Sequence, residues 1–177
     1  MMAAASNPIL VLVAGLPGTG KTTFALALAE KIGARHLNTD IIRDALGLRG
    51  RYDEKSKQKV YREMEEQTGK ALSAGERVVV DGTFYREELR APYQRLGAQA
   101  QAPLCWLIIE APEAVIKQRV SQKRYYSEAD YAVYLKIRDA WEPLGQPHFR
   151  LQSAPLKEML DKALAYIGIK NSNTGPV

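Results

Sequence analysis

The sequence predicts an α/β fold built on a mainly parallel sheet. Short apolar runs alternate along the chain with longer segments of helical character. The first run, residues 9–14 (ILVLVA), is apolar throughout and is followed by glycine, which is typical of a strand buried on both faces of a parallel sheet. Residues 21–32 then form an amphipathic segment that stops at Gly33. Right-handed crossovers between such strands place helices on both faces of the sheet.

The other elements follow from the same alternation. Five strands are predicted, at residues 9–14, 35–38, 77–81, 103–110 and 149–152. Helices are predicted at residues 21–32, 41–46, 52–74, 87–96, 111–120, 128–141 and 156–167. The helix at 52–74 is the least apolar, because Val60, Met64, Ala71 and Leu72 are too few for a full core stripe. We therefore expect this helix to be partly exposed.

Length and composition predict one globular domain. A chain of 177 residues can bury roughly 70% of the surface that its unfolded form exposes. Its 46% hydrophobic and 25% charged residues are ordinary for such a domain. The domain is expected to span residues 1–170, followed by a disordered tail at 171–177. The single cysteine, Cys105, lies in an apolar run and is expected to be a small buried hydrophobe.

Charge and hydropathy favour a cytoplasmic protein with no membrane partner. No apolar stretch reaches the roughly 18 residues that a membrane span needs, and the opening MMAAASNP lacks the features of a signal peptide. The 25 Lys and Arg residues against 20 Asp and Glu residues give a formal charge of +5. This charge suits an anionic ligand such as a nucleotide or nucleic acid, but it also serves solubility alone.

Residues 15–22, GLPGTGKT, match the phosphate-binding pattern GxxxxGK[ST] in full. The motif lies between a predicted strand and a predicted helix, so backbone N–H groups and the helix dipole converge on phosphate oxygens. Lys21 would follow the β- and γ-phosphates, and the Thr22 hydroxyl is the usual Mg²⁺ ligand. The alternative is a glycine-rich turn capped by Thr19 with Lys21 solvated. The predicted ATP-binding residues are Gly15, Pro17, Gly18, Thr19, Gly20, Lys21, Thr22 and Thr23.

Asp40 and Arg43 follow the second predicted strand and would face the crevice where ligands bind in open α/β sheets. A carboxylate there can accept the proton of an attacking hydroxyl, and an arginine can align the acceptor. The pair is therefore a candidate catalytic acceptor site. In the alternative interpretation, Asp40 or Thr39 only caps a helix and Arg43 is solvated.

Asp81 ends the third predicted strand, where an aspartate can hold Mg²⁺ directly or through water. The alternative is a turn at Asp81-Gly82. Thr83 and Arg86 lie within reach of the same crevice without a defined role. His36 and His148 are isolated from other residues at metal-ligand spacing.

A basic segment near residues 119–127 is a candidate lid that would close on the nucleotide. Arg119 is a candidate ATP-binding residue and Arg124 a candidate catalytic residue, with Lys123 between them. The alternative is a solvated basic face. Tyr125 and Tyr126 could stack on a base, but a packed or exposed position is favoured for them.

With these residues in view, the chain resembles the P-loop kinases of the adenylate-kinase type. Within them it is similar to small kinases related to the kinase domain of phage polynucleotide kinase. The matching pieces are GLPGTGKTTFA, NTDIIRDAL, VVVDGTF, EAPEAVIKQRVSQKR and SEADYAVY, which span residues 9–134. The resemblance implies a three-layer P-loop NTPase fold with sheet order 2-3-1-4-5 and a short lid.

The resemblance also implies roles for single residues. Lys21 and Thr22 would bind ATP and Mg²⁺, Asp40 would be the general base, and Arg43 would contact the acceptor. Arg119 or Arg124 would belong to the lid. The wider group is similar to enzymes that phosphorylate antibiotics, nucleotide sugars and other small alcohols, so the acceptor is not implied.

The predicted function is transfer of the γ-phosphoryl group of ATP to a hydroxyl group. The acceptor would be a polynucleotide 5′-hydroxyl or a small alcohol such as a nucleoside or antibiotic. A GTPase is disfavoured because the chain has no NKxD-type guanine motif. A non-catalytic or ATP-hydrolysing regulatory module is the main alternative, since it would share the phosphate-binding loop but would not need Asp40 and Arg43.

Overall fold

A computed structural model describes residues 7–122 and 130–169, so Arg124, Tyr125, Tyr126 and the tail lie outside the described residues. The strands are β1 (Leu10–Ala14), β2 (Arg35–Asn38), β3 (Val78–Gly82), β4 (Leu104–Glu110) and β5 (Phe149–Gln152). The helices are α1 (Lys21–Ile32), α2 (Thr39–Ala45), α3 (Glu54–Ser73), α4 (Glu87–Gln99), α5 (Glu113–Val120), α6 (Tyr131–Asp139) and α7 (Leu156–Ile167).

The strands form one sheet in the order β2-β3-β1-β4-β5, and every neighbouring pair is parallel. The predicted α/β class and strand order are confirmed. β1 lies in the centre, where Leu12 pairs with Val80 of β3 and with Trp106 of β4. All five residues of β1 are buried, as expected for a strand with neighbours on both sides and helices on both faces.

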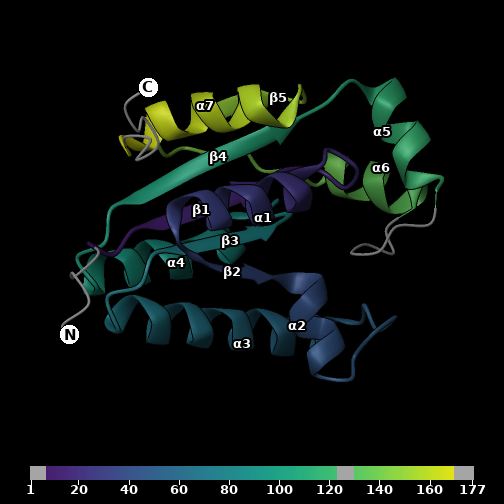
Figure 1. Ribbon diagram of the computed structural model, residues 1–177. Coiled ribbons are helices and arrows are strands. Elements are labelled where there is room, and N and C mark those ends of the chain that lie inside the picture. The colour runs from purple at the N-terminus through teal and green to yellow at the C-terminus, as the bar shows by residue number, and fades with distance from the viewer. Residues whose placement is uncertain (1–6, 123–129, 170–177) are drawn as a thin grey trace.

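Two hydrophobic cores cover the two faces of the sheet (Figure 1). Alternate residues of β1 point to opposite faces. Leu10 and Leu12 pack in the core under α3 and α4, while Val11 and Val13 pack in the core under α1 and α7. This helix, sheet and helix arrangement is the three-layer fold, and it leaves the carboxyl ends of the strands open to a ligand.

Helix α3 is attached to the sheet by a more complete stripe than its apolar residues alone predict. Its buried residues recur every four positions and include two small hydroxyl side chains. They are Ser56, Val60, Met64, Thr68 and Leu72, together with Ala71. The hydroxyl of Thr68 donates to the carbonyl oxygen of Met64 at 2.7 Å, so it is buried without an unsatisfied proton. The apolar residues alone appear too sparse for a core stripe because two of its positions are occupied by Ser56 and Thr68.

Three smaller features differ from the prediction. Helix α2 begins at Thr39 rather than residue 41. The described part of the segment after residue 129 is helical from Tyr131, because the Asp130 side chain accepts a hydrogen bond from the Val133 N–H at 3.0 Å. Cys105 is only partly buried, at the edge of the core under α1 and α7.

Within residues 7–122 and 130–169, no helix has both the length and the apolar character that a bilayer crossing requires.

Candidate active site

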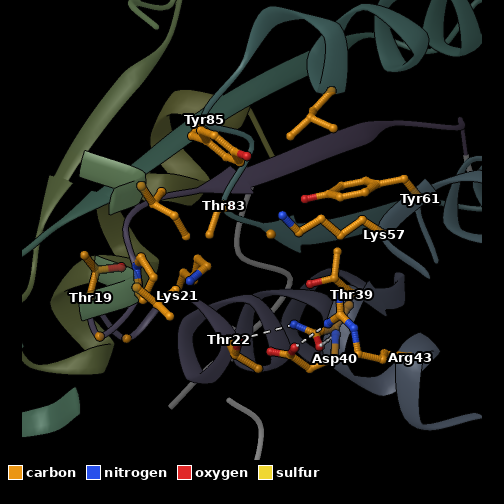
Figure 2. Close-up of a pocket in the computed structure, with 18 of the residues that line it drawn as sticks. Thr19, Lys21, Thr22, Thr39, Asp40, Arg43, Lys57, Tyr61, Thr83 and Tyr85 are labelled. Carbon is orange, nitrogen blue, oxygen red and sulfur yellow. Dashed lines mark hydrogen bonds and ion pairs between the residues drawn. The ribbon is translucent and has the colours of Figure 1, made fainter. Parts of the chain in front are cut away.

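A cleft of about 1260 Å³ opens at the carboxyl ends of the strands. One end is formed by the loop between β1 and α1, and the other by α2, α3 and the loop after β3. Figure 2 shows Lys21 and Thr22 on one side of this cleft, with Asp40 and Arg43 close by. All the predicted ATP-binding residues from Pro17 to Thr23 line this cleft. Gly15 and Asp81 are buried and are not among the lining residues.

The loop between β1 and α1, which would form a phosphate cradle, has two positions that only glycine can occupy. A Cβ atom on Gly15 would lie 2.6 Å from the carbonyl oxygen of Ile109. Gly18 has a φ of +85°, and a Cβ atom there would lie 2.8 Å from Cγ1 of Val120. Both substitutions would push the loop away from its neighbours. The cradle is thus closely packed on α5 and β4.

The first turn of α1 opens into this cradle. Its N-cap is Gly20, which offers no side chain to accept hydrogen bonds, and no acidic residue lies in the first turn. The first N–H groups of a helix have no intrahelical partner and carry the positive end of its dipole. These groups therefore fit phosphate oxygens without competition from a capping side chain among the described residues.

Thr19 and Lys21 both reach the carbonyl oxygen of Leu16. The buried Thr19 hydroxyl donates at 2.9 Å and the Lys21 ammonium at 3.5 Å. The Thr19 side chain thus closes the loop, and any contact it makes with phosphate would come from its backbone. Lys21 is partly exposed to the cleft, so its flexible side chain can turn toward an anion there.

Asp81 lies fully buried beneath Thr22 and joins several polar side chains. Its Oδ1 atom accepts hydrogen bonds from Thr22 Oγ1 at 2.8 Å and from Asn38 Nδ2 at 2.7 Å. Its Oδ2 atom contacts Nε2 of His36. The turn alternative is wrong because Gly82 continues β3. His36, which has no carboxylate at metal-ligand spacing in the sequence, meets Asp81 because the pairing of β2 with β3 brings together residues 45 positions apart.

A hydroxyl and a carboxylate side by side suit Mg²⁺, which prefers oxygen ligands and retains water and phosphate ligands. Thr22 and Asp81 supply these two groups. No cluster of three or more His, Cys, Asp or Glu side chains able to hold a metal occurs in the described residues. The residues therefore fit an ion that arrives with a nucleotide rather than one held in a cage of protein ligands.

Asn38 is the N-cap of α2. Its side-chain oxygen accepts from the backbone N–H groups of Asp40 at 2.8 Å and Ile41 at 3.1 Å. The interpretation in which Asp40 or Thr39 caps this helix is therefore wrong. A strand-end asparagine preceding TD was a signal that could have identified the cap from sequence.

The Asp40 carboxylate pairs instead with Arg43. Oδ1 of Asp40 lies 3.0 Å from Nη1 of Arg43, one helical turn away. The Arg43 side chain is only 8% exposed, and its guanidinium group lies 4.5 Å from the ring centre of Tyr52. The solvated alternative for Arg43 is therefore wrong. Stacking and the ion pair hold its planar donor group at the wall of the cleft.

Arg119 of α5 lies over the phosphate cradle. Nη1 donates to the carbonyl oxygen of Gly18 at 3.2 Å, and Nη2 donates to the Ser153 hydroxyl at 3.3 Å. It lines the cleft beside the P-loop. The structure thus brings this predicted residue to the place where a nucleotide phosphate would lie, while Arg124 is outside the described residues.

Several side chains for which the sequence predicted no role line the end of the cleft formed by α2, α3 and the loop after β3, called here the acceptor end. They are Tyr52, Lys57, Tyr61, Thr83 and Tyr85. Burial raises the pKa of Tyr61 to about 12, although a hydrogen bond with Thr83 opposes the change. Tyr61 is therefore a neutral hydroxyl at ordinary pH. Only the four-residue spacing of Lys57 and Tyr61 on α3 could have indicated that they share a face.

The loop that carries Thr83 and Tyr85 is held by a buried arginine on α4. Arg90 is 0% exposed and donates to the carbonyl oxygens of Phe84 at 2.6 Å, Glu142 at 2.5 Å and Pro143 at 3.1 Å. Phe84 itself has a φ of +48°, which is rare for a residue with a side chain. The Arg90 contacts fix this loop and the segment after α6 in one arrangement.

Solved structures of several kinases share this fold. A sugar kinase from Janibacter sp. HTCC2649 has a TM-score of 0.70 and 19% identity, over 93% of this chain and 97% of that chain. The APS kinase CysC of Mycobacterium tuberculosis has a TM-score of 0.70 and 17% identity, over 92% of this chain and 98% of that chain. A gluconokinase from Sinorhizobium meliloti 1021 has a TM-score of 0.66 and 20% identity, over 91% and 92% respectively.

The chain belongs to the AAA domain family, which residues 10–144 match. Among curated proteins, it is similar to an uncharacterized protein of Mycobacterium tuberculosis (strain H37Rv), with 32% identity over 123 residues. An uncharacterized protein of Mycobacterium bovis matches to the same extent. The match covers 63% of this chain and 25% of each of those proteins, so the chain spans about a quarter of the length of these relatives.

Proposed function

We propose that the protein is an ATP-dependent kinase that transfers the γ-phosphoryl group of ATP to a hydroxyl group of an acceptor. One observation carries this proposal: the phosphate cradle and the Asp40–Arg43 pair line the same cleft. An ATP-binding module without an acceptor would have no use for a carboxylate and a buried arginine at that place.

The nucleotide would bind at the end of the cleft made by residues 15–23. Backbone N–H groups of the loop and the first turn of α1 would hold the phosphates, and Lys21 would follow the γ-phosphoryl group. Thr22 and Asp81 would hold Mg²⁺, which neutralises charge on the phosphates when bound. Arg119, already over the loop, would stabilise charge as the phosphoryl group moves. Arg124 would add to the lid.

The acceptor would bind at the end of the cleft made by α2 and α3. Its hydroxyl oxygen forms the new bond to the γ-phosphorus, and the bond from that phosphorus to the bridging oxygen of ADP breaks. The hydroxyl proton passes to the Asp40 carboxylate. Arg43, fixed by Asp40 and Tyr52, would align the acceptor.

A small-molecule acceptor is supported by the similar folds, because the three kinases described above are named for a sugar, for APS and for gluconate. The resemblance to the kinase domain of phage polynucleotide kinase instead suggests a polynucleotide 5′-hydroxyl. In either case we propose that residues 1–170 form one kinase domain with a lid near residues 119–127.

The test is steady-state ADP release with ATP and Mg²⁺, with and without a panel of hydroxyl compounds. The panel contains a 5′-hydroxyl oligonucleotide, nucleosides, sugars, sugar acids and hydroxylated antibiotics. We expect slow release without an acceptor and a large stimulation by at least one member, with the phosphorylated product identified by mass spectrometry. Fast release that ignores every member would instead favour an ATP-hydrolysing regulatory module.

A further inference from the structure

Lys57 is a partly buried cation whose side chain lines the acceptor end of the cleft. It lies near the start of α3, one turn before Tyr61. In Figure 2 the Lys57 and Tyr61 side chains extend in the same direction, into the cavity and toward Thr83. Asp40 and Arg43 are close enough to Tyr61 to affect the pKa of its hydroxyl. Lys57 extends beside Tyr61 and lines the same cleft, so its ammonium group lies in the same part of the cleft as the proposed catalytic pair.

Lys57 differs from the arginines of this wall, because each of those is either paired with a carboxylate or exposed. Arg43 is held by Asp40, with 3.0 Å between Nη1 and Oδ1. Arg86 is held by Glu88, with 3.3 Å between Nη1 and Oε1, and Arg62 is exposed. Across residues 7–122 and 130–169, Lys57 forms neither an ion pair nor a hydrogen bond through its side chain. An ammonium group at the wall of a cleft, without a counter-charge among the described residues, can take one from an anionic ligand.

Two hydroxyl groups accompany this cation. Tyr61 and Thr83 share a side-chain hydrogen bond, and Tyr61 keeps its proton because burial raises its pKa to about 12. An ammonium group flanked by neutral hydroxyl donors is suited to a carboxylate or phosphate group, which accepts several hydrogen bonds at once. A neutral sugar hydroxyl would receive from the ammonium group only the kind of hydrogen bond that water also receives. These groups therefore give a neutral hydroxyl no advantage over water.

We propose that the acceptor is a small compound that carries an anionic group, a carboxylate or a phosphate, in addition to the hydroxyl that is phosphorylated, and that Lys57 binds this anionic group with Tyr61 and Thr83. The inference rests on the proposed kinase function and names its substrate class. The anionic group would anchor the compound while Arg43 and Asp40 act on its hydroxyl.

The carboxylates of the same wall argue for a small anion rather than a nucleic acid. Glu54, Glu65 and Glu88 line the cleft together with Lys57. A polynucleotide presents a phosphate at every nucleotide and would bring several of them against these carboxylates. A compound with a single anionic group can place it on Lys57 and avoid them.

Binding is tested on the full chain saturated with a non-hydrolysable ATP analogue and Mg²⁺, so that the phosphate cradle is occupied. Calorimetry then compares compounds that differ in one anionic group: gluconate against sorbitol, and glycerol 3-phosphate against glycerol. We expect at least one anionic member to bind about 10- to 100-fold more tightly than its neutral partner, as for hydrogen bonds to charged groups. A difference between gluconate and sorbitol identifies the bound group as a carboxylate, and a difference between glycerol 3-phosphate and glycerol identifies it as a phosphate.

Lys57→Met keeps the length of the side chain and should remove this difference. Lys59→Met is the matched control, because Lys59 is an exposed cation of the same helix that does not line the cleft. The control should retain the full difference between anionic and neutral members. Equal binding of both members in every pair, or a difference that survives Lys57→Met, would overturn the inference. Tighter binding of a 5′-hydroxyl oligonucleotide than of either small anion would do so as well.

ADP release with the same compounds separates this inference from the kinase proposal. Binding of anions that depends on Lys57, without stimulated ADP release, would leave the anion site standing and refute the kinase. Stimulation by neutral alcohols that is unchanged in Lys57→Met would leave the kinase standing and refute the anion site. Stimulation by the anionic members alone, lost in Lys57→Met, is the expected result.

Discussion

The two ends of the cleft are built from different parts of the chain. The phosphate end is made mostly of backbone: a glycine loop, the first turn of α1 and packing on β4 and α5. The acceptor end is made of side chains from α2, α3 and the loop after β3. Backbone groups are the same whatever the side chains, whereas a site made of side chains changes with each substitution. In the proposed kinase, the phosphate end would therefore fix what is donated, and the acceptor end would decide what receives it.

Among substitutions that test the difference between the two ends, Asp40→Asn is expected to have the largest effect on phosphoryl transfer. The change keeps the shape of the side chain and leaves the Asn38 cap of α2 in place, but it removes the proton acceptor. Transfer should fall by about 10²- to 10⁴-fold while ATP affinity is unchanged. Stimulated ADP release and nucleotide titration measure the two quantities. The control is Asp44→Asn, an exposed carboxylate on the same helix; equal losses in both variants would refute a catalytic role for Asp40.

Lys21→Ala breaks the other end of the cleft. Because Lys21 would contact the phosphates in both the ground state and the transition state, ATP affinity and transfer should both fall, transfer by about 10²- to 10³-fold. The thermal midpoint should stay near that of the unmodified chain. Lys31→Ala, at the exposed far end of α1, should change neither quantity. Near-normal turnover in Lys21→Ala would contradict the assignment of the loop.

Arg90→Met tests how the acceptor end is supported. The variant keeps the apolar stem but leaves three carbonyl oxygens, including that of the buried Phe84, without their donor. The free energy of unfolding should fall by about 2–4 kcal/mol, measured by urea titration. Arg95→Met, an exposed arginine of the same helix, is the control and should cost far less. Equal stability of the two variants would show that the Arg90 contacts do not hold the loop.

Arg119→Ala is expected to lower ADP release about tenfold, with and without acceptor alike. The reason is that Arg119 lies over the phosphate loop and away from Asp40. Arg43→Ala should instead remove most of the stimulation by the acceptor and leave the basal rate nearly unchanged. Identical effects of the two substitutions on the ratio of stimulated to basal rate would contradict the division between the two ends.

The smallest effect is expected at Cys105, near the amino end of β4 and far along the strand from the cleft. Burial raises the pKa of its thiol, so less of the reactive thiolate is present at a given pH than in an exposed cysteine. Alkylation by iodoacetamide at pH 8 should be slower in the native protein than in urea, and Cys105→Ala should leave transfer within about twofold, as expected for a residue outside the site. Fast native alkylation would contradict this.

The difference between the two ends also explains what the sequence could predict. The α/β class and the positions of the strands agree with expectation, because apolar runs specify backbone paths. The strand order, which the resemblance to P-loop kinases implied, agrees as well. The Asn38 cap, the His36–Asp81 contact and the Lys57 wall were missed. The Asn38 cap is local and had a sequence signal, whereas the His36–Asp81 contact depends on two strands that meet only in the folded sheet. The four-residue spacing of Lys57 and Tyr61 indicates a shared face of α3, but not which element that face meets.

Asn38 joins the two ends in a way that has a thermodynamic consequence. Its amide nitrogen donates to Asp81 below the proposed metal position, and its amide oxygen holds the first turn of the helix that carries Asp40. A ligand that shifts Asp81 therefore also shifts the base. Binding of metal-nucleotide and of acceptor should be cooperative, and reciprocity requires each to change the affinity for the other by the same factor. Asn38→Ala should weaken this coupling, and it should also loosen the first turn of α2, because it removes the cap.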